Sequence, residues 1–207
     1  MKNYETYWQA FQEQHQLSQK QIEQFKRYFE LLQEWNDKIN LTTVTELRPV
    51  LDYHFSDSLA LLKCEEIAQG AMLADVGTGG GFPGIPLKIA RPDLKILLIE
   101  VTHKKIEFLK TVIEELGLED IEITDLDWRT FLRKTEYPIS IFCGRASLQP
   151  EEMLRAIKPG CFYKSTTVIY WASAHWVADE EVAPLIIKKC PYNVRYQKRA
   201  LVFFKRA

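Results

Sequence analysis

The sequence predicts an α/β fold in which a mostly parallel, doubly wound sheet ends in an antiparallel C-terminal hairpin and is preceded by an N-terminal helical extension. Three observations lead to this prediction. The first 65 or so residues have the apolar spacing of helices, β-rich segments alternate with helical stretches after Gly70, and two β-rich segments lie close together near the C-terminal end. Such alternation is typical of a parallel sheet covered by helices. We expect one compact unit, with residues 1–68 as the extension and residues 69–207 as the sheet domain.

The extension is predicted to be helical from the spacing of its apolar residues. One face repeats every three or four positions and consists of Ile22, Phe25, Phe29, Leu32, Trp35 and Ile39. Ser18 and Gln21 fit a capping box in front of it, and Leu17 with Ile22 fits a hydrophobic staple. Shorter helical pieces are expected around residues 4–14 and 49–63.

The sheet is predicted from β-rich segments that follow Gly70, which read MLADV, KILLIEV, IEITDL, ISIFCG and STTVIYW. Between the second and third, residues 104–116 have helical spacing, and Gly117 is placed for a left-handed C-cap. Only a few polar residues separate NVRYQ from ALVFFKR, so these two segments predict a closing hairpin and an antiparallel end to the sheet.

The composition argues against several classes of protein. A net charge of -1 disfavours a protein that coats nucleic acid by bulk attraction. The four cysteines, Cys64, Cys143, Cys161 and Cys190, are far apart and have no C-x-x-C spacing, so we expect reduced thiols and no metal site. The polar N-terminal segment lacks the apolar core of a signal peptide, and no run of 18 apolar residues follows. We therefore expect a soluble, cytoplasmic protein that does not bind membranes.

Charge is nevertheless unevenly distributed. Residues 188–207 contain no acidic residue and seven basic ones, which are Lys188, Lys189, Arg195, Lys198, Arg199, Lys205 and Arg206. Such a run is typical of a solvated face or of a surface that binds phosphates, and composition leaves both interpretations open.

The segment ADVGTGGGFPGIPLKIA, residues 74–90, carries five glycines and two prolines directly after the first predicted strand. In a doubly wound sheet this first loop approaches the ligand closely, and glycine permits that approach. Asp75, Gly77, Gly79 and Gly81 fit D-x-G-x-G-x-G. The same segment also fits the G-x-G-x-x-G of dinucleotide-binding proteins through Gly79, Gly81 and Gly84.

Two further features favour an adenosyl cofactor without phosphates. Glu100 ends the second predicted strand, about 20 residues past the glycines, where nucleotide-binding folds place a carboxylate on the ribose hydroxyls. Pro83 and Pro86 remove two N–H donors from the start of the following helix, which disfavours a pyrophosphate. S-adenosylmethionine fits this loop better than a nicotinamide dinucleotide.

Five segments carry a family resemblance: WNDKINLTTVTE (35–46), HFSDSLAL (54–61), LADVGTGGGFPGIPLKIARPDLKILLIE (73–100), HKKIEFLKTVIEELGL (103–118) and GRASL (144–148). In order and spacing they resemble the bacterial RsmG family, also called GidB, over roughly residues 20–160. That family has a Rossmann-like class I methyltransferase fold and uses S-adenosylmethionine to methylate N7 of a guanine in 16S ribosomal RNA. The resemblance implies a methyltransferase domain over residues 69–207 and, as partner, ribosomal RNA or the small ribosomal subunit.

The resemblance also implies particular site residues. It implies cofactor contacts at Gly77, Phe82, Trp128, Arg129 and Arg145. The glycine loop and the acidic strand end add Asp75, Thr78, Gly79, Gly81 and Glu100 to the expected cofactor contacts. Arg145 is also the expected catalytic residue, as a rigid fork of donors for a carboxylate or for RNA. His54, Asp57 and Ser58 share one predicted helical turn, and we expect them to orient and pack rather than catalyse. The expected RNA contacts are Lys164, Lys188, Lys189, Arg195, Lys198 and Arg199.

The expected reaction needs no general base, because guanine N7 carries a free lone pair. This agrees with a sequence in which no His, Cys or Glu stands out as a poised acid or base. The target base is expected to be unstacked or extruded.

Two departures from the family pattern concern the substrate half of the site. GRAS replaces S-R-A-F, which changes positions 144 and 147, and VIYWAS replaces a strand that ends in L-K-G, although Lys164 lies nearby. Three functions therefore stay open: the methyltransferase, a cofactor-binding protein that has lost turnover and assists ribosome assembly or regulation, and a nicotinamide-dependent oxidoreductase. A monomer is expected.

Overall fold

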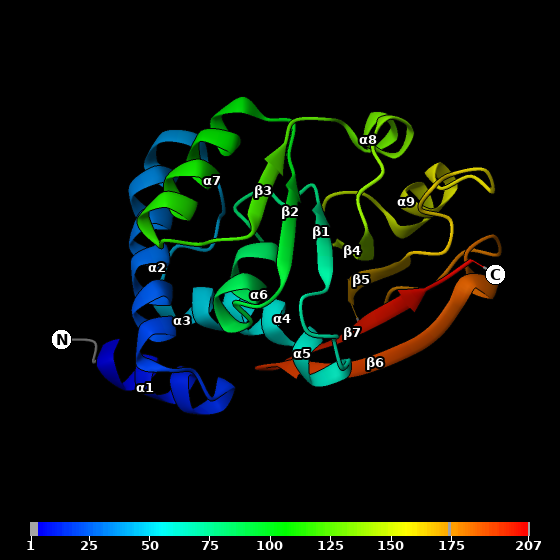
Figure 1. The fold of residues 1–207 in the computed structure, drawn as a ribbon. Coiled ribbons are helices and arrows are strands. Elements are labelled where there is room, and N and C mark those ends of the chain that lie inside the picture. The colour runs from blue at the N-terminus through cyan, green and yellow to red at the C-terminus, as the bar shows by residue number, and fades with distance from the viewer. Residues whose placement is uncertain (1–3, 174, 207) are drawn as a thin grey trace.

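The computed structural model describes residues 4–173 and 175–206 and has a seven-stranded sheet at its centre (Figure 1). The strands are β1 (Met72–Val76), β2 (Lys95–Ile99), β3 (Ile121–Thr124), β4 (Ile139–Gly144), β5 (Thr167–Ser173), β6 (Ile186–Val194) and β7 (Gln197–Phe204). Their order is β3-β2-β1-β4-β5-β7-β6. The first five strands pair in parallel, and β7 runs antiparallel to both β5 and β6. The predicted α/β fold with an antiparallel end is confirmed.

Helices precede the sheet and connect its strands. The N-terminal ones are α1 (Tyr4–His15), α2 (Gln19–Ile39), α3 (Leu47–Val50), the π-helix η1 (Leu51–Ser56), α4 (Asp57–Leu59) and α5 (Leu61–Cys64). The later ones are α6 (Gly84–Ala90), α7 (His103–Glu115), α8 (Trp128–Lys134), α9 (Pro150–Ala156) and the 3-10 helix η2 (Ala183–Leu185). The predicted capping box is present, since the Gln21 N–H donates to Ser18 Oγ (3.3 Å) and the Ser18 N–H donates to Gln21 Oε1 (2.8 Å).

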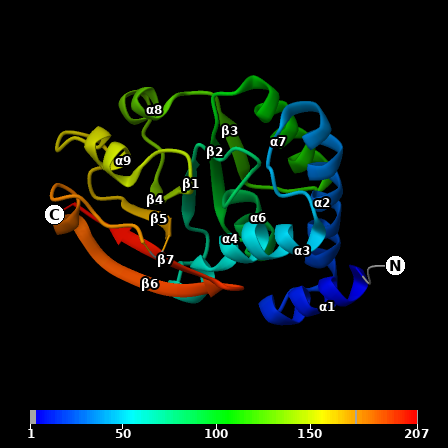
Figure 2. The same ribbon diagram turned by 180° about the vertical axis from the view of Figure 1, so that it is seen from behind.

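The described core lies in two clusters on opposite faces of the sheet. Alternate residues of β1 and β2 divide between them: Leu73 and Leu98 pack with α1, α2, α6 and α7, whereas Val76 and Ile99 pack with α8 and α9. Figure 2 shows these two sets of helices on either side of the strands. The helical extension thus shares one core with the sheet, because Phe25 and Phe55 belong to the same cluster as Leu73 and Leu98.

The closing hairpin is longer than predicted and its turn is displaced. The segment NVRYQ was expected to be a strand, but Arg195 and Tyr196 form the turn between β6 and β7. β6 begins earlier, at Ile186. Its two lysines and Pro191 are not typical of a strand, so the sequence did not indicate this part of it. β6 is an edge strand, the position at which a sheet tolerates proline.

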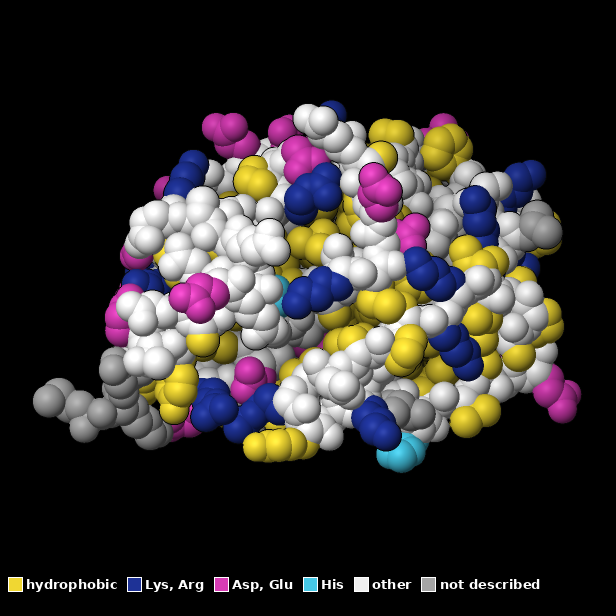
Figure 3. All heavy atoms as spheres, turned by 90° about the horizontal axis from the view of Figure 1, so that it is seen from below, with side chains coloured by type: hydrophobic (Ala, Val, Ile, Leu, Met, Phe, Trp, Pro, Cys, Tyr) yellow, Lys and Arg dark blue, Asp and Glu magenta, His cyan; other side chains and the backbone are white. Residues whose placement is uncertain are grey.

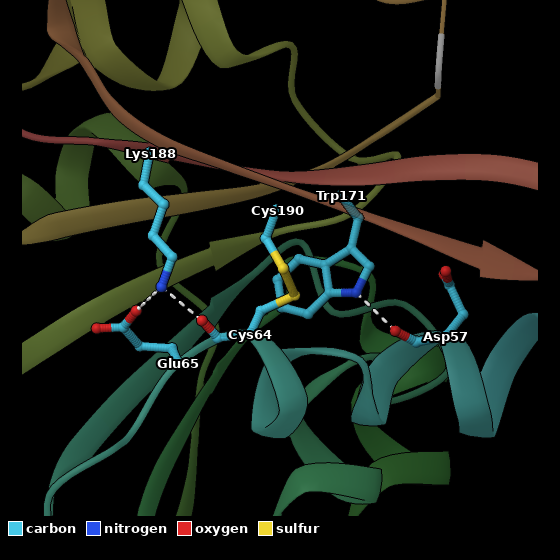
Figure 4. The surroundings of a disulfide bond; sticks show 6 residues. All are labelled: Asp57, Cys64, Glu65, Trp171, Lys188 and Cys190. Carbon is cyan, nitrogen blue, oxygen red and sulfur yellow. Dashed lines mark hydrogen bonds and ion pairs between the residues drawn. A yellow bond between two sulfur atoms is a disulfide. The ribbon is translucent and has the colours of Figure 1, made fainter.

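The prediction of four reduced cysteines is wrong for two of them. Cys64 at the end of α5 and Cys190 in β6 form a disulfide, with Cα atoms 6.0 Å apart, while Cys143 and Cys161 are free. Figure 4 shows this bond joining α5 to the hairpin. The two cysteines are 126 residues apart in sequence, so no local spacing indicates the pair.

Within the part of the chain that the structure describes, no helix has the length and apolar character that a membrane span needs.

Candidate functional site

The glycine loop after β1 has a backbone conformation that glycine supplies. Gly77, Gly79 and Gly81 have positive φ angles of +66°, +59° and +93°. The Gly77 N–H donates to the Ile99 carbonyl (2.8 Å), which ties the loop to the end of β2. A Cβ on Gly77 would overlap the Cβ of Ser147, and a Cβ on Gly81 would lie 2.5 Å from Ile85 Cδ1.

Asp75 supports this loop from below. Its buried Oδ2 accepts from Thr78 Oγ1 (2.6 Å) and from the Gly84 N–H (2.8 Å), so one carboxylate fixes both the loop and the start of α6. Its Oδ1 has no hydrogen-bond partner among the described residues. Burial raises the pKa of Asp75 to about 6, although both hydrogen bonds oppose the shift.

A pocket of about 360 Å³ opens above the loop, within the size range of small-molecule sites. Strand order reverses between β1 and β4, so the pocket lies at the topological switch point where doubly wound folds bind ligands. The lining residues are Leu41, Thr42, His54, Gly77, Thr78, Gly79, Gly80, Phe82, Glu100, Lys105, Arg145, Ala146 and Ser147.

Glu100 lies in this pocket with both oxygens oriented by backbone. Oε2 accepts from the Gly79 N–H (3.0 Å) and Oε1 accepts from the Thr102 N–H (2.8 Å). A carboxylate can accept about four hydrogen bonds, so Glu100 keeps acceptor capacity for a ligand hydroxyl.

Arg145 follows β4 and forms another wall of the pocket. Its side chain is 10% exposed and lies over the Phe82 ring, 4.9 Å from the ring centroid. Nη1 pairs with Asp57 Oδ2 (3.2 Å) and donates to the Tyr53 carbonyl (3.2 Å). The guanidinium is therefore held in place before any ligand binds.

His54 packs on the same aromatic ring and lies next to Arg145, with His54 Nδ1 3.5 Å from Arg145 Nη2. Its imidazole stacks on Phe82 with ring centroids 4.7 Å apart, and Nε2 is 2.7 Å from Thr42 Oγ1. Burial, together with the positive charge of Arg145, lowers the pKa of His54 to about 3. With this pKa the ring is neutral at physiological pH.

The predicted residues do not all meet at this pocket. Gly77, Thr78, Gly79, Phe82, Glu100 and Arg145 line it, while Asp75 and Gly81 support the loop beneath. Trp128 is buried against Phe142 and donates Nε1–H to the Met153 carbonyl (3.2 Å). Arg129 is exposed in a different hollow between α8 and α9. A cofactor role for Trp128 and Arg129 stays a prediction.

Some of the predicted RNA-binding residues form ion pairs within the protein, and others do not. Lys188 pairs with Glu65 (2.6 Å), Arg195 with Asp52 (3.2 Å) and Arg199 with Asp57 (2.9 Å). Lys189 lies over the Trp176 ring, 5.8 Å from its centroid. The structure shows no side-chain partner for Lys164 or Lys198 among the described residues, and both are exposed.

Figure 3 shows one face of the molecule on which Lys and Arg side chains alternate with hydrophobic ones across the centre and right. Asp and Glu side chains lie mostly toward its upper and left margins.

Six residues that line the pocket were not among the predicted site residues: Leu41, Thr42, Gly80, Lys105, Ala146 and Ser147. Thr42 lies in the segment WNDKINLTTVTE, so that motif was the available signal. Ser147 was noted only as a departure from S-R-A-F. Its Oγ donates to the Val76 carbonyl (2.6 Å) and its Cβ occupies the space above Gly77. At Gly144, the other changed position of GRAS, Met153 fills the adjacent space, with Sδ 2.6 Å from a Cβ built there.

The fold and the position of the pocket define the class, a Rossmann-like α/β protein of the class I methyltransferase type. Solved structures with similar folds include MtNAS in complex with MTA and tNA (TM-score 0.64, 18% identity, 88% of this chain and 74% of that chain). A SAM-dependent methyltransferase from Aquifex aeolicus is also similar (TM-score 0.52, 16% identity, 75% and 93%). At these identities the similarity concerns the fold alone.

The chain belongs to the GidB family, described as rRNA small subunit methyltransferase G, whose pattern matches residues 21–184. A relative from Lachnoclostridium phytofermentans, named ribosomal RNA small subunit methyltransferase G, is 42% identical over 156 residues, which is 71% of this chain and 63% of the relative. A relative of the same name from Lactococcus lactis subsp. lactis is 50% identical over 109 residues, which is 52% of this chain and 46% of the relative. The matched part thus spans less than two thirds of either relative.

Proposed function

We propose that this protein is an S-adenosylmethionine-dependent methyltransferase that modifies N7 of a guanine in 16S ribosomal RNA. The observation that carries the proposal is the pocket at the switch point of the sheet, where the glycine loop, Glu100 and Arg145 meet. Membership of the GidB family supplies the class of substrate.

The residues of the pocket fit the proposed cofactor, which supplies an electrophilic sulfonium methyl group when bound. Glu100 has spare acceptor capacity for ribose hydroxyls, and Gly79 leaves room for a ligand against the backbone, since a Cβ there would meet nothing within 4 Å. Arg145 offers guanidinium donors to a carboxylate. The unpartnered Oδ1 of Asp75 adds negative potential beneath the loop, which suits a cationic ligand.

The chain's contribution to the reaction is orientation rather than proton transfer. Guanine N7 needs no deprotonation. The neutral His54 ring already forms a hydrogen bond with Thr42 and stacks on Phe82. Alignment of attacking and leaving atoms contributes roughly 7–11 kcal/mol in well-oriented systems. Phe82, which contacts both His54 and Arg145, gives the pocket a rigid wall for that alignment.

The proposal includes the partner and the setting. The exposed Lys164, Lys189 and Lys198 supply phosphate contacts, and the cytoplasm is where a ribosomal substrate is found. We expect the protein to act as a monomer on an unstacked guanine.

The test is methylation of small ribosomal subunits from a strain that lacks the endogenous modification. Wild-type protein is expected to transfer one methyl group per subunit, and Arg145→Ala to lower kcat/KM by about 100-fold, as removal of a charged ligand contact does. Arg27→Ala is the matched control, because Arg27 does not line the pocket and its ion pairs, with Glu30 and Glu34 on α2 and Glu115 on α7, are exposed.

Binding experiments separate the alternatives. A heat-shift with S-adenosylhomocysteine and none with NAD is expected. Stabilisation by NAD alone would favour the oxidoreductase. Cofactor binding without methylation of any subunit preparation would favour the binding protein that has lost turnover.

A further inference from the structure

Asp57 lies between the pocket and the closing hairpin and contacts both. Its side chain is 3% exposed and both oxygens are engaged. Oδ2 pairs with Arg145 Nη1 (3.2 Å), whereas Oδ1 pairs with Arg199 Nε (2.9 Å) and accepts from the Tyr192 hydroxyl (2.7 Å). One carboxylate thus joins the loop after β4 and the strands β6 and β7 to α4.

The backbone that carries Asp57 is fixed to the sheet and the hairpin. The Trp171 indole N–H donates to the Asp57 carbonyl (2.8 Å) from β5, as Figure 4 shows. A short distance along the chain, the Cys64–Cys190 disulfide and the Glu65–Lys188 ion pair join the end of α5 to β6. These contacts give the Asp57 carboxylate a defined position.

Charge makes this position important for Arg145. A buried guanidinium needs a counter-ion, because an unpaired buried charge is strongly disfavoured. Among the described residues, Asp57 is the acid within ion-pair distance of Arg145. The other contacts of Arg145 are neutral: the Tyr53 and His54 carbonyls, the His54 ring and the Phe82 ring.

We propose that Asp57 is a positioning residue for the cofactor site, which holds the Arg145 guanidinium at the pocket wall and links that orientation to the hairpin through Arg199 and Tyr192. Asp57 does not itself line the pocket, so it acts through Arg145. The identity of the ligand rests on the proposed function, whereas the orientation of Arg145 does not.

A double-mutant cycle on the full chain tests the proposal, with binding of S-adenosylhomocysteine measured by calorimetry. Asp57→Asn is expected to raise Kd about 10-fold, a usual size of coupling between residues in contact. In the Arg145→Gln background the same change is expected to alter Kd less than 2-fold. An equal loss in both backgrounds, or wild-type Kd in folded Asp57→Asn, would overturn the proposal.

Glu65→Gln is the matched control. It removes another carboxylate that pairs with the hairpin but does not contact Arg145, so Kd is expected to stay within 2-fold of wild type. If Asp57→Asn does not fold, Asp57→Asn with Arg199→Gln restores the charge balance, and the same Kd increase is expected of this pair relative to Arg199→Gln alone.

A measurement without cofactor keeps the two proposals distinct. In nitrogen-15 NMR spectra of the free chain, the guanidinium protons of Arg145 are expected to exchange slowly with solvent in wild type and in Glu65→Gln. In Asp57→Asn the Arg145 signal is expected to broaden. A wild-type chain that binds no S-adenosylhomocysteine would contradict the proposed function, and the Arg145 signal would still decide the role of Asp57. An unchanged signal in Asp57→Asn would contradict that role.

Discussion

Gly77 and Gly79 have similar φ angles but different surroundings. Comparing them separates two reasons for glycine at a position: a left-handed backbone conformation and a lack of space for a Cβ. Both have positive φ, yet a Cβ on Gly79 meets nothing within 4 Å, whereas one on Gly77 overlaps Ser147. Gly79→Ala should cost about 1 kcal/mol of unfolding free energy, from the left-handed conformation alone. Gly77→Ala should cost about 3 kcal/mol, because overpacking is added. Urea unfolding of the two variants measures the difference.

Ser147→Gly provides the control for this prediction. In that background the overlap is removed, and the cost of Gly77→Ala should fall to that of Gly79→Ala. If the cost of Gly77→Ala does not change, the close approach of Ser147 is not its cause.

The raised pKa of Asp75 predicts that the stability of the fold depends on pH. Its pKa is raised from 3.8 to about 6 in the folded state, so the folded protein binds more protons than the unfolded chain between these values. Stability from this group therefore falls as pH rises from about 4 to 6 and stays lower above that range. The loss is roughly 3 kcal/mol.

Asp75→Asn should remove this dependence while keeping an acceptor for Thr78 and Gly84. The unfolding free energy of the variant relative to wild type should increase between pH 4 and pH 7, as urea titrations at the two pH values would measure. A constant difference across this range would mean that Asp75 titrates normally.

At the scale of elements, the disulfide joins α5 to the edge strand β6. It closes a loop of 126 residues, and removal of such a bond usually costs about 2–5 kcal/mol. Cys64→Ser should lower the unfolding free energy by that amount, and dithiothreitol should do the same to wild type. Cys161→Ser is the control, because Cys161 is free. Four reactive thiols in the denatured, unreduced chain would contradict the pairing.

Elements with strong local signals were predictable from the sequence. α2 begins one residue after its predicted cap at Ser18, and ISIFCG coincides with β4. α8 and α9 have seven residues each, which is too short for apolar periodicity to stand out. β6 was missed in part because its lysines and proline are tolerated only at an edge, and edge position is a property of the assembled sheet.

At the scale of the whole molecule, the basic residues near the C-terminal end differ in availability. Lys198 is exposed without a side-chain partner among the described residues, whereas the Lys188 ammonium donates to Glu65 (2.6 Å) and to the Cys64 carbonyl (2.5 Å). Lys198→Ala should reduce the slope of log binding constant against log salt by about 0.7–0.9 for RNA. Lys188→Ala should reduce it less. Filter binding from 50 to 200 mM salt measures both, and equal slopes would show that the ion pair does not restrain Lys188.

Only one half of the site, the glycine loop with Glu100, was predictable from the sequence. The glycine loop and Glu100 follow adjacent parallel strands, so sequence order alone brings them to the same sheet edge, and the structure places both in one pocket. The ion pair between Arg145 and Asp57 joins residues 88 positions apart on different elements. Such a contact depends on the packing of α4 against the sheet, which no local pattern encodes.

The position of β6 and β7 in the chain has a consequence for synthesis. Both are translated after every other described element, yet Arg199 and Tyr192 complete the surroundings of Asp57, and Cys190 completes the disulfide. A nascent chain that has emerged only as far as β5 can form the glycine loop but not the finished support of Arg145. On the proposed role of Asp57, the full binding geometry is expected only after the hairpin has left the exit tunnel.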